Sequence, residues 1–339
     1  MSILVCGGAG YIGSHTCVEL IQAGYEIIVA DNYSNSCEEV LARVEMITGV
    51  RFPYSRVELC DMGEVENLFT CYPDIDTVIH FAGLKAVGES ISKPIEYYSN
   101  NIISTLFLLH AMRRHGVKNF IFSSSATVYG TPTVVPISET SPTGKTTNPY
   151  GTTKLFQEQI LSDLCAADPT FNVVILRYFN PIGAHESGLI GEDPSGIPNN
   201  LVPYIAKVAV GQLACVHILG DDYSTPDGTG VRDYIHVVDL AKGHIAALKK
   251  LKENCGLFVC NLGTGKGYSV LEVLHAYEKA CHHKLPYVIS PRRPGDVAIC
   301  YADSSKARRE LDWEAKMGIE EMCASSWKWQ SNNPNGYKG

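Results

Sequence analysis

The sequence predicts an α/β fold, in which a doubly wound parallel sheet is joined to a second, smaller mixed α/β lobe. Three observations predict it. Short β-branched runs alternate with amphipathic helical stretches through the first half of the chain. A glycine-rich turn follows the first of these runs and precedes the first helical stretch. From about residue 181, glycine, proline and asparagine replace the regular alternation, which indicates a change of architecture.

The individual elements follow from local composition. Strands are predicted at 3–6, 26–30, 77–81, 120–123 and 173–176, where β-branched and other apolar residues dominate. Helices are predicted at 14–23, which Gly24 ends, and at 102–114, which stops before Gly116. We expect one domain at 1–180 and a second lobe at 181–339, with 234–247 and 258–262 packing back onto the first sheet.

Composition excludes several classes of protein. A chain of 339 residues is long enough for two domains. Its 28 Lys and Arg against 36 Asp and Glu leave a net charge of −8, which disfavours nucleic acid and anionic membrane surfaces as partners. No basic residue precedes Arg43, so the start resembles neither a secretory signal nor a transit peptide. No apolar run approaches the roughly 18 residues of a membrane span.

The cysteines predict a reducing compartment. All 12 are scattered singly, with no CxxC pair, which favours reduced thiols in a cytoplasmic protein. Cys281, His282 and His283 are consecutive and cannot share one face of a helix. We therefore expect no metal site.

The glycine-rich turn predicts a dinucleotide site in a Rossmann-like domain. Gly7, Gly10 and Gly13 stand between a strand and a helix, where glycine permits a tight turn and close approach to a pyrophosphate. The helix N-terminus adds unpaired N–H groups. Asp31 follows Gly7 by 24 residues, near the expected ribose-binding acid, and would repel a 2′-phosphate. The pattern thus favours NAD over NADP, although turn geometry alone could also explain these residues.

A second set of residues predicts acid–base chemistry. Tyr150 and Lys154 are spaced i,i+4, so that a helix would place both on one face. A neighbouring cation stabilises a phenolate, which makes tyrosine usable as a base. Ser125 closes an apolar strand, at the edge where ligands bind in open α/β sheets. The alternatives are a surface helix pair for the tyrosine and lysine, and a helix cap for the serine.

The chain has a glycine-rich turn, a serine at a strand end and a YxxxK motif, in this order. In this it resembles the extended form of the short-chain dehydrogenase/reductase superfamily. The runs GGAGYIGSHT, HFAGLKAVGES, FSSSATVYG, RYFNPIGAH, GIPNNLVPYIA and DGTGVRDYIHV are similar to those of the UDP-glucose (UDP-galactose) 4-epimerase family. The resemblance extends from residue 3 to about residue 337. It implies an NAD-binding domain at 1–180, a UDP-sugar-binding lobe at 181–339 and a homodimer.

The resemblance also implies the cofactor contacts. These are the glycines of the turn and residues along the adjoining strand ends: Gly7, Gly10, Tyr11, Ile12, Gly13, Asp31, Asn32, Ser36, Asp61, Met62, Phe81, Ala82, Gly83, Lys85, Asn100, Tyr150, Lys154 and Phe179.

For the UDP-hexose, the resemblance implies contacts from both lobes. They are Ser125, Tyr150, Asn180, Asn200, Leu201, His217, Ile218, Leu219, Arg232, Arg293, Asp296 and Cys300. Arginine forks suit diphosphate oxygens. At Cys300 many bacterial family members carry tyrosine, and members with a small residue resemble enzymes that also accept N-acetylated sugars. The resemblance therefore implies a possible UDP-GalNAc/UDP-GlcNAc activity; a buried filler is the alternative for this cysteine.

The activity implied is reversible C4 epimerisation of UDP-galactose and UDP-glucose through a transient 4-keto sugar, with Tyr150, Lys154 and Ser125 as catalytic residues. Two alternatives stay open. A nucleotide-sugar dehydratase or decarboxylase shares the glycines and YxxxK, but the resembling dehydratases have an Asp-Glu pair where this chain has Ala126-Thr127-Val128. A catalytically silent dinucleotide sensor could dispense with the Tyr–Lys pair.

Overall fold

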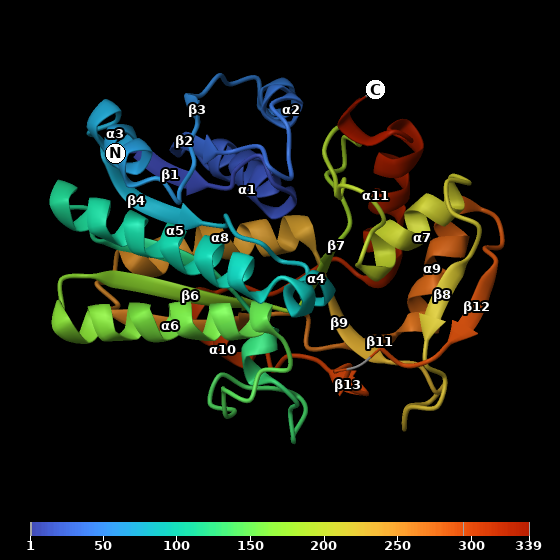
Figure 1. The fold of residues 1–339 in the computed structure, drawn as a ribbon. Helices are drawn as coiled ribbons and strands as arrows, with labels where there is room; N and C mark the ends of the chain where they lie inside the picture. Colours follow the sequence, from blue (N-terminus) through green and yellow to red (C-terminus); the bar gives the residue numbers. More distant parts are fainter. Residues whose placement is uncertain (1, 294, 339) are drawn as a thin grey trace.

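The larger part of the molecule is a seven-stranded parallel sheet with helices on both faces (Figure 1). The computed structural model describes residues 2–293 and 295–338. The strand order is β10-β6-β5-β4-β1-β2-β3, and every neighbouring pair is parallel. The strands are β1 (Ser2–Cys6), β2 (Glu26–Asp31), β3 (Tyr54–Arg56), β4 (Ile75–His80), β5 (Asn119–Ser125), β6 (Asn172–Tyr178) and β10 (Leu257–Leu262). The predicted doubly wound sheet is confirmed.

Both faces of this sheet are buried, which explains the continuous apolar runs in its strands. In β1, Ile3 and Val5 face one core, and Leu4 and Cys6 face the other. The first core contacts α1 (Tyr11–Gln22), α2 (Glu39–Thr48), α8 (Val237–Leu251) and α10 (Ser305–Leu311). The second contacts α3 (Met62–Cys71), α5 (Pro94–His115) and α6 (Pro149–Ala167), and α4 (Val87–Ser92) packs beside α5 and α6.

The second lobe combines two small sheets with three helices. One sheet has the order β11-β9-β13 with β7 also beside β9, and the other pairs β8 with β12. These strands are β7 (Asn180–Ile182), β8 (Val216–Leu219), β9 (Val231–His236), β11 (Gly267–Ser269), β12 (Tyr287–Ser290) and β13 (Ile299–Cys300). The helices α7 (Leu201–Ala209), α9 (Val270–Cys281) and α11 (Ile319–Asn332) share a core with them. Short 3₁₀ turns, η1 (Ala126–Tyr129) and η2 (Gly336–Lys338), complete the chain.

The chain crosses between the two parts more than once. β9 belongs to the sheet of the second lobe that also contains β7, β11 and β13. The next helix, α8, packs against α1 on the large sheet. β10 then pairs with β6 and forms the edge of the large sheet. Of the helices in the described residues, none combines the length and apolar character needed to cross a membrane.

Candidate active site

A cavity of about 790 Å³ opens at the carboxyl ends of the large sheet and is closed on its other side by the second lobe. Its walls come from the loops after β1, β2, β4, β5 and β6, and from α6, α7, β8 and β9. Ligands bind at this edge of open α/β sheets because the loops and helix N-termini converge there. Most of the predicted site residues therefore meet at the position that the topology favours.

The glycine turn is shaped so that side chains would not fit. A Cβ on Gly13 would lie 2.2 Å from the carbonyl oxygen of Gly7, and one on Gly7, at φ +80°, would lie 2.7 Å from the backbone nitrogen of Ala82. The helix N-terminus at Gly10 has no side-chain cap. Its N–H groups are thus free to face an anion in the cavity. This cradle fits the pyrophosphate of a dinucleotide.

Asp31 ends β2, lines the cavity and organises the turn around it. One carboxylate oxygen accepts a hydrogen bond from the backbone of Ala9 at 3.0 Å. The other accepts from the backbone of Tyr33 at 2.9 Å and from the hydroxyl of Ser36 at 2.9 Å. The carboxylate therefore both shapes the turn and presents negative charge where a ribose is expected.

Tyr150 and Ser125 come together at the cavity from different elements. Tyr150 lies in the first turn of α6, which Asn148 caps by accepting from the backbone of Gly151 at 2.8 Å, and Ser125 ends β5. Burial raises the pKa of Tyr150 to about 12, and its hydrogen bond with Ser125 acts in the opposite direction. Without further positive charge the phenol is neutral at pH 7.

Lys154 places its amino group near the phenol of Tyr150 and the strand that ends at Ser125. Its amino group donates a 2.6 Å hydrogen bond to the carbonyl oxygen of Ser123 and lies 6.0 Å from the ring centroid of Tyr150 and 4.7 Å from that of Phe122. Burial lowers the pKa of Lys154 to about 7, and Glu158 acts in the opposite direction. The spacing that the sequence indicated thus places a buried amine next to the phenol.

Most of the predicted site residues line this one cavity. On the sheet side they are Gly7, Gly10, Tyr11, Ile12, Gly13, Asp31, Asn32, Ser36, Phe81, Gly83, Lys85, Ser125, Tyr150, Lys154 and Phe179. From the second lobe and the segment leading to it come Asn180, Asn200, Leu201, His217, Leu219, Arg232, Arg293, Asp296 and Cys300.

Five predicted residues do not line it: Asp61, Met62, Ala82, Asn100 and Ile218. Asp61 caps α3 by accepting from the backbone of Gly63 and Glu64. Ile218 is fully buried, whereas the exposed residues of β8 on either side of it, His217 and Leu219, line the cavity. These five stay predictions whose side chains the structure does not bring to the cavity wall.

One carboxylate, Asp296, pairs with two arginines of the second lobe that line the cavity. Arg293 forms a two-pronged pair with Asp296 at 3.1 and 2.8 Å, and Arg232 lies 3.8 Å from the same carboxylate. Bidentate guanidinium groups of this kind also match phosphate oxygens. A diphosphate entering here would meet both arginines.

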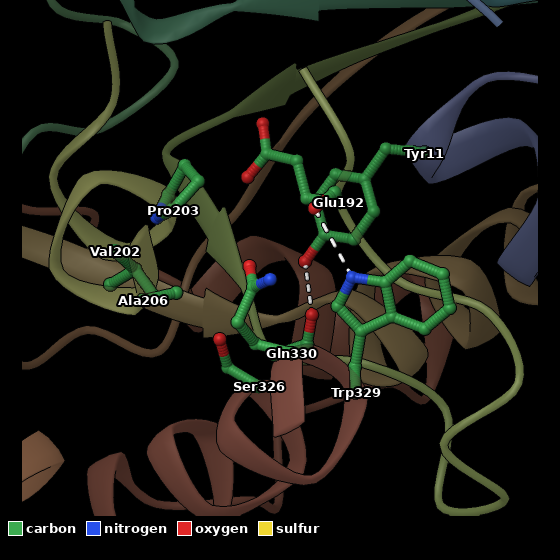
Figure 2. Close-up of a pocket in the computed structure, with 9 residues that line it drawn as sticks. Tyr11, Glu192, Val202, Pro203, Ala206, Ser326, Trp329 and Gln330 are labelled. Atoms are coloured by element: carbon green, nitrogen blue, oxygen red, sulfur yellow. Dashed lines mark hydrogen bonds between the residues drawn. The ribbon is translucent and has the colours of Figure 1, made fainter. Parts of the chain in front are cut away.

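Glu192 is a cavity residue that sequence reasoning missed. Its carboxylate accepts from Lys85 at 3.1 Å and from Asn200 at 3.3 Å, and so joins the sheet side to the second lobe. Its backbone oxygen accepts from Trp329 at 3.3 Å (Figure 2). Glu192 lies in the irregular segment 181–200, whose composition indicated a loop but whose sequence contains no spacing that marks a single acid.

A small second cavity lies between Tyr11 and the C-terminal helix (Figure 2). Its volume of about 10 Å³ is comparable to the space that one water occupies. Beside it, the hydroxyl of Tyr11 donates to the carbonyl oxygen of Gly183 at 2.7 Å. This bond ties the N-terminus of α1 to the loop that contains Glu192. The predicted cofactor contact Tyr11 therefore also joins the two lobes.

Known proteins resemble this chain over its whole length. A family model described as GDP-mannose 4,6 dehydratase matches residues 4–326. UDP-glucose 4-epimerase of Bacillus subtilis (strain 168) is 60% identical, with 100% of this chain and 99% of that protein covered. The human UDP-glucose 4-epimerase is 56% identical, with 99% and 98% covered.

A solved structure of a UDP-glucose 4-epimerase also resembles this chain in its fold. UDP-glucose 4-epimerase from Bifidobacterium longum in complex with NAD⁺ and UDP superposes with a TM-score of 0.96 at 62% identity, covering 99% of this chain and 100% of that one. The family model bears the name of a dehydratase, but the Bacillus subtilis, human and Bifidobacterium longum relatives are epimerases that match from end to end. The chain therefore belongs to the UDP-glucose 4-epimerase family, within the extended short-chain dehydrogenases/reductases.

Proposed function

We propose that this chain interconverts UDP-galactose and UDP-glucose by reversible inversion at C4 of the hexose, with NAD as its retained cofactor. The observation that carries the proposal is the convergence of Ser125, Tyr150 and Lys154 on the cavity that also contains the glycine cradle. The Bifidobacterium longum relative was solved in complex with NAD⁺ and UDP, which supports NAD as the cofactor and a substrate that contains UDP.

NAD supplies a hydride acceptor that returns the hydride later in the cycle. The chain's own part begins with holding the cofactor. The cradle at Gly7, Gly10 and Gly13 accommodates the pyrophosphate, and the carboxylate of Asp31 accepts from ribose hydroxyls. The other cofactor contacts implied by the resemblance, including the five residues away from the cavity wall, remain part of this proposal.

Proton removal from the sugar falls to Tyr150. The phenolate accepts the proton of the C4 hydroxyl, with Ser125 in the hydrogen-bond path between them. In the isolated site the phenol is neutral, because burial raises the pKa of Tyr150 to about 12. The ammonium group of Lys154 opposes this by stabilising the negative charge of the phenolate. The same phenol gives the proton back when the C4 configuration is restored or inverted.

Inversion requires the 4-keto sugar to present its other face while the nucleotide stays bound. We assign Arg232, Arg293 and Asp296, which line the cavity, to the diphosphate and ribose, and His217 and Leu219 of β8, which line it too, to the base. Many contacts on the nucleotide and few on the hexose allow the sugar to turn about its link to the diphosphate. We assign the sheet domain, 1–180, to the cofactor and the lobe, 181–339, mainly to UDP-sugar.

The test is incubation of the pure protein with UDP-galactose and no added NAD, with products separated by chromatography. UDP-glucose is the expected product. A keto-sugar would instead support a dehydratase, and unchanged substrate would support a sensor. Tyr150→Phe should abolish turnover and retain bound cofactor; full activity in this variant would contradict the assignment of the base.

Cys300 favours a second activity, interconversion of UDP-GalNAc and UDP-GlcNAc. Its side chain lines the cavity at the end of β13, beside Arg232 in the register with β9. A thiol occupies much less volume than a tyrosine, which leaves room for an acetamido group. Incubation with UDP-GalNAc tests this proposal, and absence of UDP-GlcNAc among the products would contradict it.

We also propose a homodimer formed by the outer faces of α5 and α6. Phe156 is 46% exposed and Ile95 is 75% exposed, and the ring of Tyr98 lies 6.1 Å from that of Phe156. Light scattering after size exclusion should give the mass of two chains, and Phe156→Glu should give one. The free state of all twelve cysteines supports a cytoplasmic location.

A further inference from the structure

A buried carboxylate, Glu158, lies on the same helix face as the reacting residues. Tyr150, Lys154 and Glu158 follow one another in α6 at intervals of four residues, so their side chains form one row. Glu158 is 7% exposed, and its partner Arg177 on β6 is 6% exposed. The mechanism above gives neither of them a role.

Three hydrogen bonds hold the Glu158 carboxylate. Arg177 donates from Nε to Oε1 at 3.0 Å and from Nη2 to Oε2 at 2.7 Å, and the Ser124 hydroxyl donates to Oε1 at 2.5 Å. A buried ion pair gives little net stability compared with apolar side chains of equal volume. Its position next to the reacting groups therefore points to a role other than stability.

The pair is attached to both sides of Ser125. On one side, Ser124 bonds to Glu158, and the carbonyl oxygen of Ser123 accepts from Lys154. On the other side, Arg177 donates from Nη1 to the hydroxyl of Tyr129 at 2.8 Å. Tyr129 closes η1, the turn that starts directly after Ser125. The buried Glu158–Arg177 pair thus forms hydrogen bonds to the chain on both sides of Ser125, through Ser124 before it and Tyr129 after it.

The charges around Lys154 make Glu158 electrostatically important. Other titratable groups in this region are Tyr150 on α6, His80 on β4, and Tyr178 on β6, which interacts with Ser123 and Tyr150. Arg177 on β6 is the positively charged partner of Glu158. Burial lowers the pKa of His80 to about 3 and raises those of both tyrosines, so all three are neutral at pH 7. Among the groups named here, Glu158 carries a negative charge, which raises the pKa of Lys154 and also balances the positive charge of Arg177.

We propose that Glu158 is a positioning residue for the reaction. Through Ser124 and Arg177 it fixes the segment that contains Ser125, and its charge keeps Lys154 in the cationic form that a Tyr150 phenolate requires. This inference rests on the roles proposed above for Tyr150 and Lys154. It assigns to Glu158 no contact with substrate or cofactor.

Glu158→Gln tests the charge, because glutamine keeps the shape and can still accept a hydrogen bond from Ser124. We expect kcat near pH 7 to fall about tenfold, with KM for UDP-galactose changed by less than about twofold. The alkaline limb of the kcat–pH profile should move to lower pH, because a lysine that loses a negative neighbour gives up its proton at lower pH. An unmoved limb would overturn the proposal.

Arg177→Lys is the matched control, since it disturbs the same buried pair but retains both charges. We expect a lower melting temperature and an alkaline limb that coincides with that of the wild type. Equal displacement of the limb in both variants would show that disruption of the network, and not the charge of Glu158, causes the shift, and would overturn the charge role.

A third variant guards against misfolding. Glu158→Gln combined with Arg177→Met removes both buried charges and leaves no unpaired guanidinium. We expect it to fold and again to show a displaced alkaline limb; a wild-type limb would overturn the proposal. A wild-type enzyme that leaves UDP-galactose unchanged contradicts the proposed function, whereas an active wild type with an unshifted Glu158→Gln profile contradicts this inference alone.

Discussion

The amino group of Lys154 donates a 2.6 Å hydrogen bond to the carbonyl oxygen of Ser123. The bond joins the first turns of α6, which contain Tyr150, to the end of β5, which contains Ser125. An amine buried this deeply is costly to keep charged, which is why burial lowers the pKa of Lys154 to about 7. The site therefore depends on hydrogen bonds and neighbouring charges that keep the cation in place.

Gly13→Ala should prevent retention of the cofactor. The added methyl group would lie 2.2 Å from the carbonyl oxygen of Gly7, so the turn or α1 must shift. We expect little NAD in the purified variant, measured by absorbance and by release on acid treatment. Gly318→Ala is the control, since its Cβ meets only Glu321 at 3.7 Å; equal NAD content in both variants would contradict the steric argument.

Arg43→Ala should loosen the contact between α2 and the C-terminal segment. The guanidinium group donates to the carbonyl oxygen of Leu189 at 3.0 Å and to Asn333 at 2.7 Å, and lies 5.0 Å from the ring centroid of Tyr337. Loss of these bonds should lower the free energy of unfolding by about 2 kcal/mol, measured by urea titration.

The control for that prediction is Arg114→Ala. Arg114 pairs with Glu66 at 2.8 Å, but its side chain is 63% exposed. Exposed pairs contribute little because water and salt screen them, so the change should stay within about 0.5 kcal/mol. A comparable loss in both variants would show that the Arg43 contacts do not contribute as argued.

Stability should fall in acid because burial lowers the pKa of five histidines among the described residues, His185 included. Burial lowers the pKa of His15 and His80 to about 3, and of His236 and His244 to about 4. Below about pH 6.5 the unfolded chain binds protons that the folded chain does not. Stability is therefore full above that pH and is lost progressively toward pH 4.

Melting temperatures measured between pH 7.5 and pH 4.5 check the acid prediction. His80→Gln should flatten the dependence, since it removes one of the five groups. His110→Gln, at an exposed position of α5, should leave it as in the wild type. A melting temperature that does not change over this range would refute the linkage argument.

Cys300→Tyr should separate the two proposed activities. The phenol ring would extend from the end of β13 into the cavity and occupy the volume required by an acetamido group. We expect turnover of UDP-GalNAc to be lost and that of UDP-galactose to remain within about tenfold. Cys300→Ser is the control, because it keeps the small volume. Retained UDP-GalNAc turnover in the tyrosine variant would contradict the assignment.

Local patterns predicted the sheet well, and they also indicated the residues that we propose to react. The apolar runs in β1, β2, β4, β5 and β6 are long because both faces of a parallel sheet are buried, and such runs are visible in sequence. The cradle at Gly7 and Gly13 and the i,i+4 pair Tyr150 and Lys154 are each encoded within a few residues. These features need only the turn or helix in which they lie, so the sequence indicated them without knowledge of the rest.

Tertiary structure decided the contacts between residues that are far apart in the sequence or belong to different elements. Glu192 binds Asn200 and also Lys85, which is more than one hundred residues away in the sequence. Glu158 of α6 pairs with Arg177 of β6. No spacing encodes such contacts, because packing of the two lobes and of α6 on the sheet creates them. The sequence by itself determined the local features that indicate which groups react, and the fold decided which buried charges and hydrogen bonds surround them, since electrostatic effects depend on distance in space.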